Sequence, residues 1–205
     1  MSFLSELHLD ALTEVFNIGA GRAALSLSEI VGDEVKLSVP RIQFYQSSEI
    51  TAEALSLNSP RLGAVNQHFS GPFDADAMLL FTEERALEIV RDMMGSQLSI
   101  EELAEFEHEA MCELGNIILN ACLSSMADIL NITLHSSLPT YAVNSSDIIL
   151  QQMVAAANQP VMLALHIDLA IVRRHSEGYL VFLLSSSSLE ELLTHIDRFI
   201  SGIGT

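Results

Sequence analysis

The sequence repeats one pattern at an interval of 99 positions, and this repeat constrains the fold more than any other feature. Apolar residues recur with the period of a helix across residues 10–31 and again across residues 101–130. The aligned apolar pairs are Leu12 with Met111, Ala23 with Cys122, Leu27 with Met126 and Ile30 with Ile129. A second long helix at this interval predicts that the chain consists of two copies of one unit.

The segments that follow the two long helices have the same order. In each half we expect a strand, a proline, further strands and a shorter closing helix. The first strand of each half is expected to end at the proline, Pro40 or Pro139, because proline lacks the N–H that a strand ladder needs. The predicted strands are residues 34–39, 62–69, 77–81, 131–138, 148–154, 160–173 and 178–184, and the closing helices are residues 83–94 and 189–200.

This order predicts an α+β fold in which the long helices pack on one shared, largely antiparallel β-sheet. The two repeats cover about residues 8–100 and 101–205. No segment rich in Gly, Ser or Pro separates them, so we expect a single pseudo-twofold domain over residues 1–205. The duplication can itself replace a dimer interface, and the sequence leaves the oligomeric state open.

The composition excludes several classes of protein. Hydrophobic residues make up 49% of the chain and charged residues 18%, which is typical of a well-buried globular protein and excludes a disordered one. The formal net charge is −18, so nucleic acid and anionic membrane surfaces are unfavourable partners.

The sequence also predicts a cytoplasmic location. The apolar run at residues 161–172 is short and contains His166 and Asp168, so we expect no membrane insertion. The N-terminus lacks the pattern of a signal peptide. Cys112 and Cys122 lie ten positions apart on one predicted helix, about 15 Å along its axis, which is too far for a disulfide. These features are typical of a reduced, cytoplasmic protein.

Each long helix carries a row of polar residues opposite its apolar stripe. The row in the first helix is Asp10, Glu14, Asn17 and Gly21, and the row in the second is Glu109, Glu113, Asn116 and Asn120. Both rows have spacings of 4, 3 and 4, which places their members along one side of a helix. In the first half Pro40 follows Asn17 by 23 positions, and in the second half Pro139 follows Asn116 by the same 23 positions.

For a single Glu-x-x-Asn pattern, a solvated helix face is the favoured explanation. However, the Glu, the Asn and the Pro are identical in both halves, whereas most of the other aligned helix positions differ. This internal comparison favours a functional role for the three residues. The seven histidines are scattered without the paired spacing of a metal site, so we expect the chain to bind no metal or other cofactor of its own.

The doubled pattern resembles the phosphatase signature of the CheC/CheX/FliY family, and the resemblance extends over nearly the whole chain. Two segments are typical of that family: Glu14-Val-Phe-Asn17-Ile-Gly-Ala-Gly21 and Glu113-Leu-Gly-Asn116-Ile. The resemblance implies hydrolysis of the aspartyl phosphate on a CheY-like response regulator. Two intact copies of the motif favour the CheC branch of the family, because a CheX-like chain is expected to carry one intact copy. We also expect no flagellar switch domain of the kind that FliY-like proteins add.

The resemblance gives each motif residue an expected role. Asn17 and Asn116 would orient the attacking water, since an amide both donates and accepts hydrogen bonds. Glu14 and Glu113 would pair with a cation on the regulator, and Mg²⁺ would be supplied in the regulator's own acidic pocket. Pro40 and Pro139 would shape the neighbouring strand. Asp10 and Glu109 would either stabilise the helix N-terminus or help docking.

The second copy departs from the family pattern in ways that make equal activity of the two sites doubtful. Glu109 stands where the family has Asp or Ser, and Gly19 and Gly21 are replaced by Ile118 and Asn120. The alternative function is a non-catalytic interaction module that binds a response regulator or a CheD-type deamidase. The presence of the amide in both copies favours the enzyme.

Overall fold

The computed structural model describes residues 4–46, 49, 51, 59–94, 99–155, 161–171 and 174–203. The first half contains α1 (Glu6–Val31), β1 (Val35–Gln46), β2 (Arg61–Ser70), β3 (Ala75–Thr82) and α2 (Glu83–Met94). The second half contains α3 (Ile100–Leu130), β4 (His135–Ser136), β5 (Thr140–Ser145), α4 (Ser146–Ala155), β6 (Val161–Ile171), β7 (Arg174–Leu184) and α5 (Ser186–Ile203).

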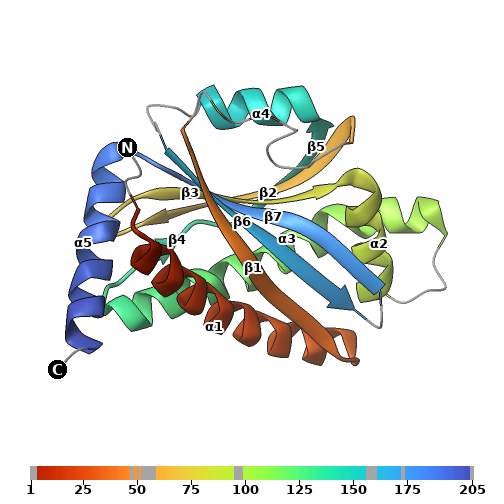
Figure 1. Ribbon diagram of the computed structural model, residues 1–205. Coiled ribbons are helices and arrows are strands. Elements are labelled where there is room, and N and C mark those ends of the chain that lie inside the picture. Colours follow the sequence, from red (N-terminus) through yellow and green to blue (C-terminus); the bar gives the residue numbers. More distant parts are fainter. Residues whose placement is uncertain are drawn as a thin grey trace.

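The described strands form one seven-stranded sheet in the order β1-β6-β7-β3-β2-β4, with β5 also paired to β2. Every pairing between these strands is antiparallel. In Figure 1, α1 and α3 lie below the sheet, α4 lies above it, and α5 and α2 lie at its two ends. The α+β fold with long helices on a shared antiparallel sheet is therefore confirmed.

The strand order matches what a duplication would produce. Exchanging the two halves of the chain replaces β1 by β5, β2 by β6 and β3 by β7, and the reverse. After this exchange, the strand order read from the opposite edge of the sheet is again β1-β6-β7-β3-β2-β5. The two long helices also end at equivalent positions, because Gly32 and Asn131 both adopt the left-handed conformation of a helix C-cap, with φ of 72° and 52°. The internal duplication itself stays a prediction.

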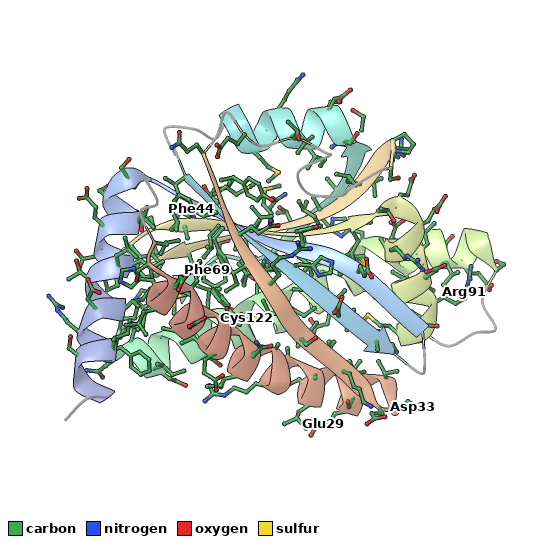
Figure 2. The ribbon with its side chains drawn as sticks, in the orientation of Figure 1. Glu29, Asp33, Phe44, Phe69, Arg91 and Cys122 are labelled. Atoms are coloured by element: carbon green, nitrogen blue, oxygen red, sulfur yellow. The ribbon has the colours of Figure 1, made fainter. Side chains whose placement is uncertain are left out.

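The helices α1 and α3 cross at a glycine. A Cβ atom on Gly19 would lie 2.5 Å from the Cα of Cys122, which is closer than packed atoms can approach. The missing side chain therefore lets the two backbones come together. Cys122 is buried at this crossing beside α1 (Figure 2). Both cysteines lie on α3, as the sequence predicts, and both are free thiols.

The core lies mainly between the sheet and this helix pair. Phe16, Phe69 and Phe182 are among its largest fully buried side chains, and the rings of Phe16 and Phe182 stack at 5.3 Å. Among the described helices, α3 from Glu105 to Leu130 is long and apolar enough to cross a membrane by length and composition alone. Its packing against α1 and the sheet, with 56% of its most apolar window buried, is that of a core helix.

Outside the first copy of the motif, three sequence expectations were wrong in detail. Residues 148–154 form helix α4 instead of a strand, because a short apolar run does not distinguish the two, and the Oγ of Ser145 accepts from the N–H of Ile148 at the start of the helix. Residues 131–138 contain only the two-residue strand β4, and the longer β5 begins after Pro139. Ile30, expected in the buried stripe, is 50% exposed.

Candidate functional site

The first copy of the motif lies on the middle of α1, on the side that borders β1. Asp10 and Glu14 are exposed, and Asn17 is half-buried one turn after Glu14. Gly21 is also exposed, and a Cβ added there would meet nothing within 4 Å. The two carboxylates are therefore open to solvent, and the helix surface at Gly21 carries no side chain. The Asn17 side chain, in contrast, faces the neighbouring strand.

The side-chain amide of Asn17 is bound to the backbone of Val39. Its Nδ2 donates to the carbonyl oxygen of Thr13 at 2.9 Å and to that of Val39 at 3.2 Å. Its Oδ1 accepts from the N–H of Val39 at 2.9 Å. These bonds hold the middle of α1 against β1, and they leave one lone pair of Oδ1 as the remaining hydrogen-bonding capacity of the side chain.

A β-bulge presents Val39 to this amide. Between Ser38 and Arg41 the register of β1 against β6 shifts, so β1 carries one extra residue there. Val39 and Pro40 occupy the bulge, and β1 continues through it to Gln46, so the expectation that Pro40 ends the strand is wrong. The spacing between Asn17 and Pro40 thus has a structural cause, because the residue before the proline is the one that Asn17 binds.

The second copy has the same residues but different contacts. Glu109 and Glu113 are exposed on α3, and Asn116 is half-buried. The Oδ1 of Asn116 accepts from the Nδ2 of Asn120 at 2.7 Å, and the same Nδ2 donates to the carbonyl oxygen of Asn116 at 2.8 Å. Within the described part of the chain, the Nδ2 of Asn116 donates no hydrogen bond.

The strand beside Asn116 explains this difference. Leu138, which precedes Pro139 as Val39 precedes Pro40, is 89% exposed, whereas Val39 is 1% exposed. The carbonyl oxygen of Pro139 lies 3.9 Å from the Cys112 thiol of α3, which donates to it. The residue whose backbone binds the amide in the first copy is therefore exposed in the second, and the hydrogen bonds of the described residues include none between Leu138 and Asn116.

A different pair holds α3 to its strand. The hydroxyl of Tyr141 on β5 donates to Oε1 of Glu107 on α3 at 2.5 Å. Burial, the hydrogen bond to Glu107 and the charge of that carboxylate all raise the pKa of Tyr141 above its ordinary value of 10.0. Sequence reasoning missed both residues, because the aligned positions of the first half are His8 and Ile42 and carry no such pair.

The Glu and Asn residues that the two copies share lie on the helix surfaces, and a cavity of about 200 Å³ borders the second copy beyond them, at Asn120 and Ser124. A cavity of about 380 Å³ lies on the side of the sheet near α4, lined by residues that include His68, Asp76, Leu138 and Gln152. None of the Glu and Asn residues of the motif lines it. Within the described ranges, no group of three or more His, Cys, Asp or Glu side chains could hold a metal ion. Exposed carboxylates beside an amide on a helix surface can contact a macromolecular partner more readily than enclose a small molecule.

Comparison with known proteins agrees with the motif. A model of the CheC-like family matches residues 7–43, which include the first copy of the motif from Asp10 to Pro40. The CheY-P phosphatase CheC of Bacillus subtilis is 23% identical over 171 residues, covering 82% of this chain and 81% of the relative.

The solved structures share the fold at low identity. FliY of Thermotoga maritima superposes with a TM-score of 0.77 and 20% identity, covering 96% of this chain and 99% of that one. The middle domain of FliM from H. pylori has a TM-score of 0.58 and 18% identity, with 94% and 99% coverage. A chain in the CheX–CheY–BeF3–Mg²⁺ complex of Borrelia burgdorferi has a TM-score of 0.51 and 15% identity, with 84% and 97% coverage.

The chain therefore has the fold class of the solved FliY structure and of the FliM middle domain. Within that class, the resemblance to the CheC/CheX/FliY family that the doubled motif predicts is confirmed by the family model and by the relative from Bacillus subtilis.

Proposed function

We propose that this protein acts in bacterial chemotaxis as a phosphatase of a phosphorylated CheY-like response regulator. The relative from Bacillus subtilis bears that activity in its name, and a structure of similar fold contains CheX together with CheY and the phosphoryl mimic BeF3. Such a partner is cytoplasmic, so we propose the same location for this chain. The roles of individual residues are part of the proposal.

The observation that supports the proposal most strongly is the hydrogen bonding of the Asn116 side-chain amide. Its amide NH2 has no acceptor within the described part of the chain, it lies on a helix surface, and the exposed Glu113 is one turn away. A half-buried amide whose NH2 has no acceptor is suited to a ligand that supplies one. Phosphoryl oxygens are such acceptors, and they gain charge as phosphoryl transfer proceeds.

Hydrolysis of an aspartyl phosphate needs an in-line water and stabilisation of the spreading charge, and little covalent work from the protein. In our proposal the Asn116 amide lies beside the phosphoryl group, and its remaining oxygen lone pair orients the water. Glu113 pairs with a cation on the regulator, because a carboxylate this close to a phosphoryl group would otherwise repel it. The Mg²⁺ ion belongs to the regulator, and this chain supplies none of its ligands.

We further propose that the two copies are unequal. The amide of Asn17 already makes three hydrogen bonds within the protein, two of them to Val39. To take a phosphoryl oxygen, Asn17 would have to release the strand, at the cost of leaving the Val39 backbone groups without partners. Asn116 needs no such rearrangement, so we assign the main activity to Glu113 and Asn116.

The second candidate function is a non-catalytic module that binds a response regulator or a CheD-type deamidase. The FliM middle domain shares this fold, and one fold can host catalytic and non-catalytic functions alike, which supports this candidate. The bonding of Asn17 also gives one of the two motif asparagines a structural role. This candidate predicts binding without acceleration of phosphate loss.

The two candidates are separated by measuring phosphate release from a panel of phosphorylated response regulators, with binding to each regulator measured in parallel. Acceleration with at least one regulator supports the phosphatase. Binding to a regulator whose dephosphorylation rate stays at its own intrinsic value supports the interaction module.

A further inference from the structure

Asn120 stands one helical turn after Asn116 and directs both of its bonds to that residue. Its Nδ2 donates to the Oδ1 of Asn116 at 2.7 Å and to the carbonyl oxygen of Asn116 at 2.8 Å. Residues four apart on a helix lie on one face, so the pair is held without any third element. The contact fixes which end of the Asn116 amide points toward Asn120.

The orientation of an asparagine amide is otherwise ambiguous. Rotation by 180° about its last torsion exchanges the oxygen and the nitrogen, and the two states differ little in shape. Here the rotated state would place the NH2 of Asn116 against the NH2 of Asn120, two donors facing each other. The donated bond therefore keeps the oxygen of Asn116 toward Asn120 and its NH2 directed away from it.

The first copy has no counterpart of this contact. The aligned position is Gly21, which has no side chain and open space around it. In that copy the backbone of Val39 binds both ends of the Asn17 amide. In the second copy Leu138 is exposed, the described residues show no hydrogen bond between it and Asn116, and Asn120 binds the oxygen of the amide instead.

We propose that Asn120 is a positioning residue, which holds the amide of Asn116 with its NH2 presented to the phosphoryl group of the regulator. The proposal rests on the proposed phosphatase function for its kinetic consequence. Its structural content, the orientation of the Asn116 amide by Asn120, is a property of the protein without its partner. Asn120 itself touches neither the phosphoryl group nor the water.

The test compares Asn120→Ala and Asn120→Asp with Ser124→Ala, a control at the next exposed position of the same helix face. Asp has nearly the size of Asn but cannot donate to the Oδ1 of Asn116, and its carboxylate would draw the NH2 inward. Two readouts are needed. One is kcat and KM for dephosphorylation of the regulator, and the other is the NMR position of the side-chain NH2 signals of Asn116 in the free protein.

We expect both Asn120 variants to lower kcat about tenfold with KM changed less than twofold, because misplacing a positioned group costs rate rather than binding. The NH2 signals of Asn116 are expected to move in both variants and to stay in place in Ser124→Ala. In an Asn116→Ala background, the Asn120 substitutions are expected to cause no further loss.

Two results would overturn the proposal. One is an unchanged set of Asn116 NH2 signals in the Asn120 variants, and the other is an equal loss of kcat with and without Asn116. If the wild type dephosphorylates no regulator, the proposed function fails, and the NMR comparison still decides whether Asn120 orients the amide. Circular dichroism of each variant confirms that a loss of rate is not a loss of fold.

Discussion

Asn17 and Val39 are joined by a pair of hydrogen bonds, one in each direction, between a helix side chain and the backbone of a β-bulge. The equivalent pair in the second half, Asn116 and Leu138, is not joined in this way, and Leu138 is exposed. One residue pattern therefore serves two purposes in the same chain, and the two asparagines should respond differently to substitution.

Replacing Asn17 should destabilise the protein more than replacing Asn116. Asn17→Ala removes three hydrogen bonds and leaves the backbone groups of Val39 without partners, so we expect a loss of about 1–3 kcal/mol in the free energy of unfolding. Asn116→Ala removes one side-chain hydrogen bond, the one that Oδ1 accepts from Asn120, and we expect a loss below about 0.5 kcal/mol. Urea unfolding of both variants measures the difference, and equal losses would contradict the structural role of Asn17.

The crossing of α1 and α3 can be tested with two glycines of one helix. Gly19→Ala would place a methyl group on the Cys122 backbone, and we expect a loss of about 1–3 kcal/mol. Gly21→Ala is the matched control. It meets open space and improves helix propensity, so we expect a gain of up to about 1 kcal/mol. Thermal unfolding should move in opposite directions for the two variants, and a tolerated Gly19→Ala would refute the close crossing.

Tyr141→Phe should weaken the attachment of β5 to α3 at neutral pH, by about 1–2 kcal/mol, because Glu107 loses its buried donor. The pKa of Tyr141 is raised in the folded state, so the unfolded chain loses the phenol proton first as pH rises above about 10. The stability that Tyr141 contributes is therefore complete below pH 10 and declines above it.

The free-energy difference between wild type and Tyr141→Phe should accordingly shrink when unfolding is measured at pH 11 instead of pH 8. Tyr45→Phe provides a comparison at a tyrosine whose hydroxyl donates to the neutral side chain of Gln43 instead of a carboxylate; burial raises the pKa of Tyr45 as well, so the same direction is expected there. A difference for Tyr141→Phe that grows with pH would contradict the assigned direction.

The two thiols should react at very different rates. Burial raises the pKa of Cys122 to about 12, and it also raises the pKa of the half-buried Cys112. Thiolate is the reactive form, so Cys122 is protected by both its protonation and its position at the helix crossing. We expect iodoacetamide at pH 8 to label Cys112 first and Cys122 only after unfolding. Mass spectrometry of the labelled peptides distinguishes the two, and early labelling of Cys122 would show that the crossing opens.

Periodicity predicted the two long helices and the antiparallel α+β fold because their apolar faces are long and regular. It did not predict α4, where the run Ile148-Ile-Leu is too short to distinguish a helix from a strand. The doubled motif predicted the positions of Glu14, Asn17, Glu113 and Asn116 on the helix surfaces.

What each asparagine contacts could not be predicted from the motif. The bond from Asn17 to Val39 depends on a bulge in a pairing with β6, more than 120 residues later in the chain, and no local pattern reports that register. The pair of Tyr141 and Glu107 likewise depends on how β5 lies against α3. The contact of Asn120 with Asn116 could be predicted from the sequence, because residues four apart on a helix are neighbours.

The measurement that tests the central claim most directly is the rate of phosphate loss from a regulator that the protein accelerates, compared for wild type, Asn116→Ala and Asn17→Ala under conditions where all three are folded. We expect Asn116→Ala to lose at least about tenfold of the acceleration while it still binds the regulator, and Asn17→Ala to retain most of it. Full acceleration by Asn116→Ala, with or without a loss in Asn17→Ala, would contradict the assignment of the main site to Glu113 and Asn116.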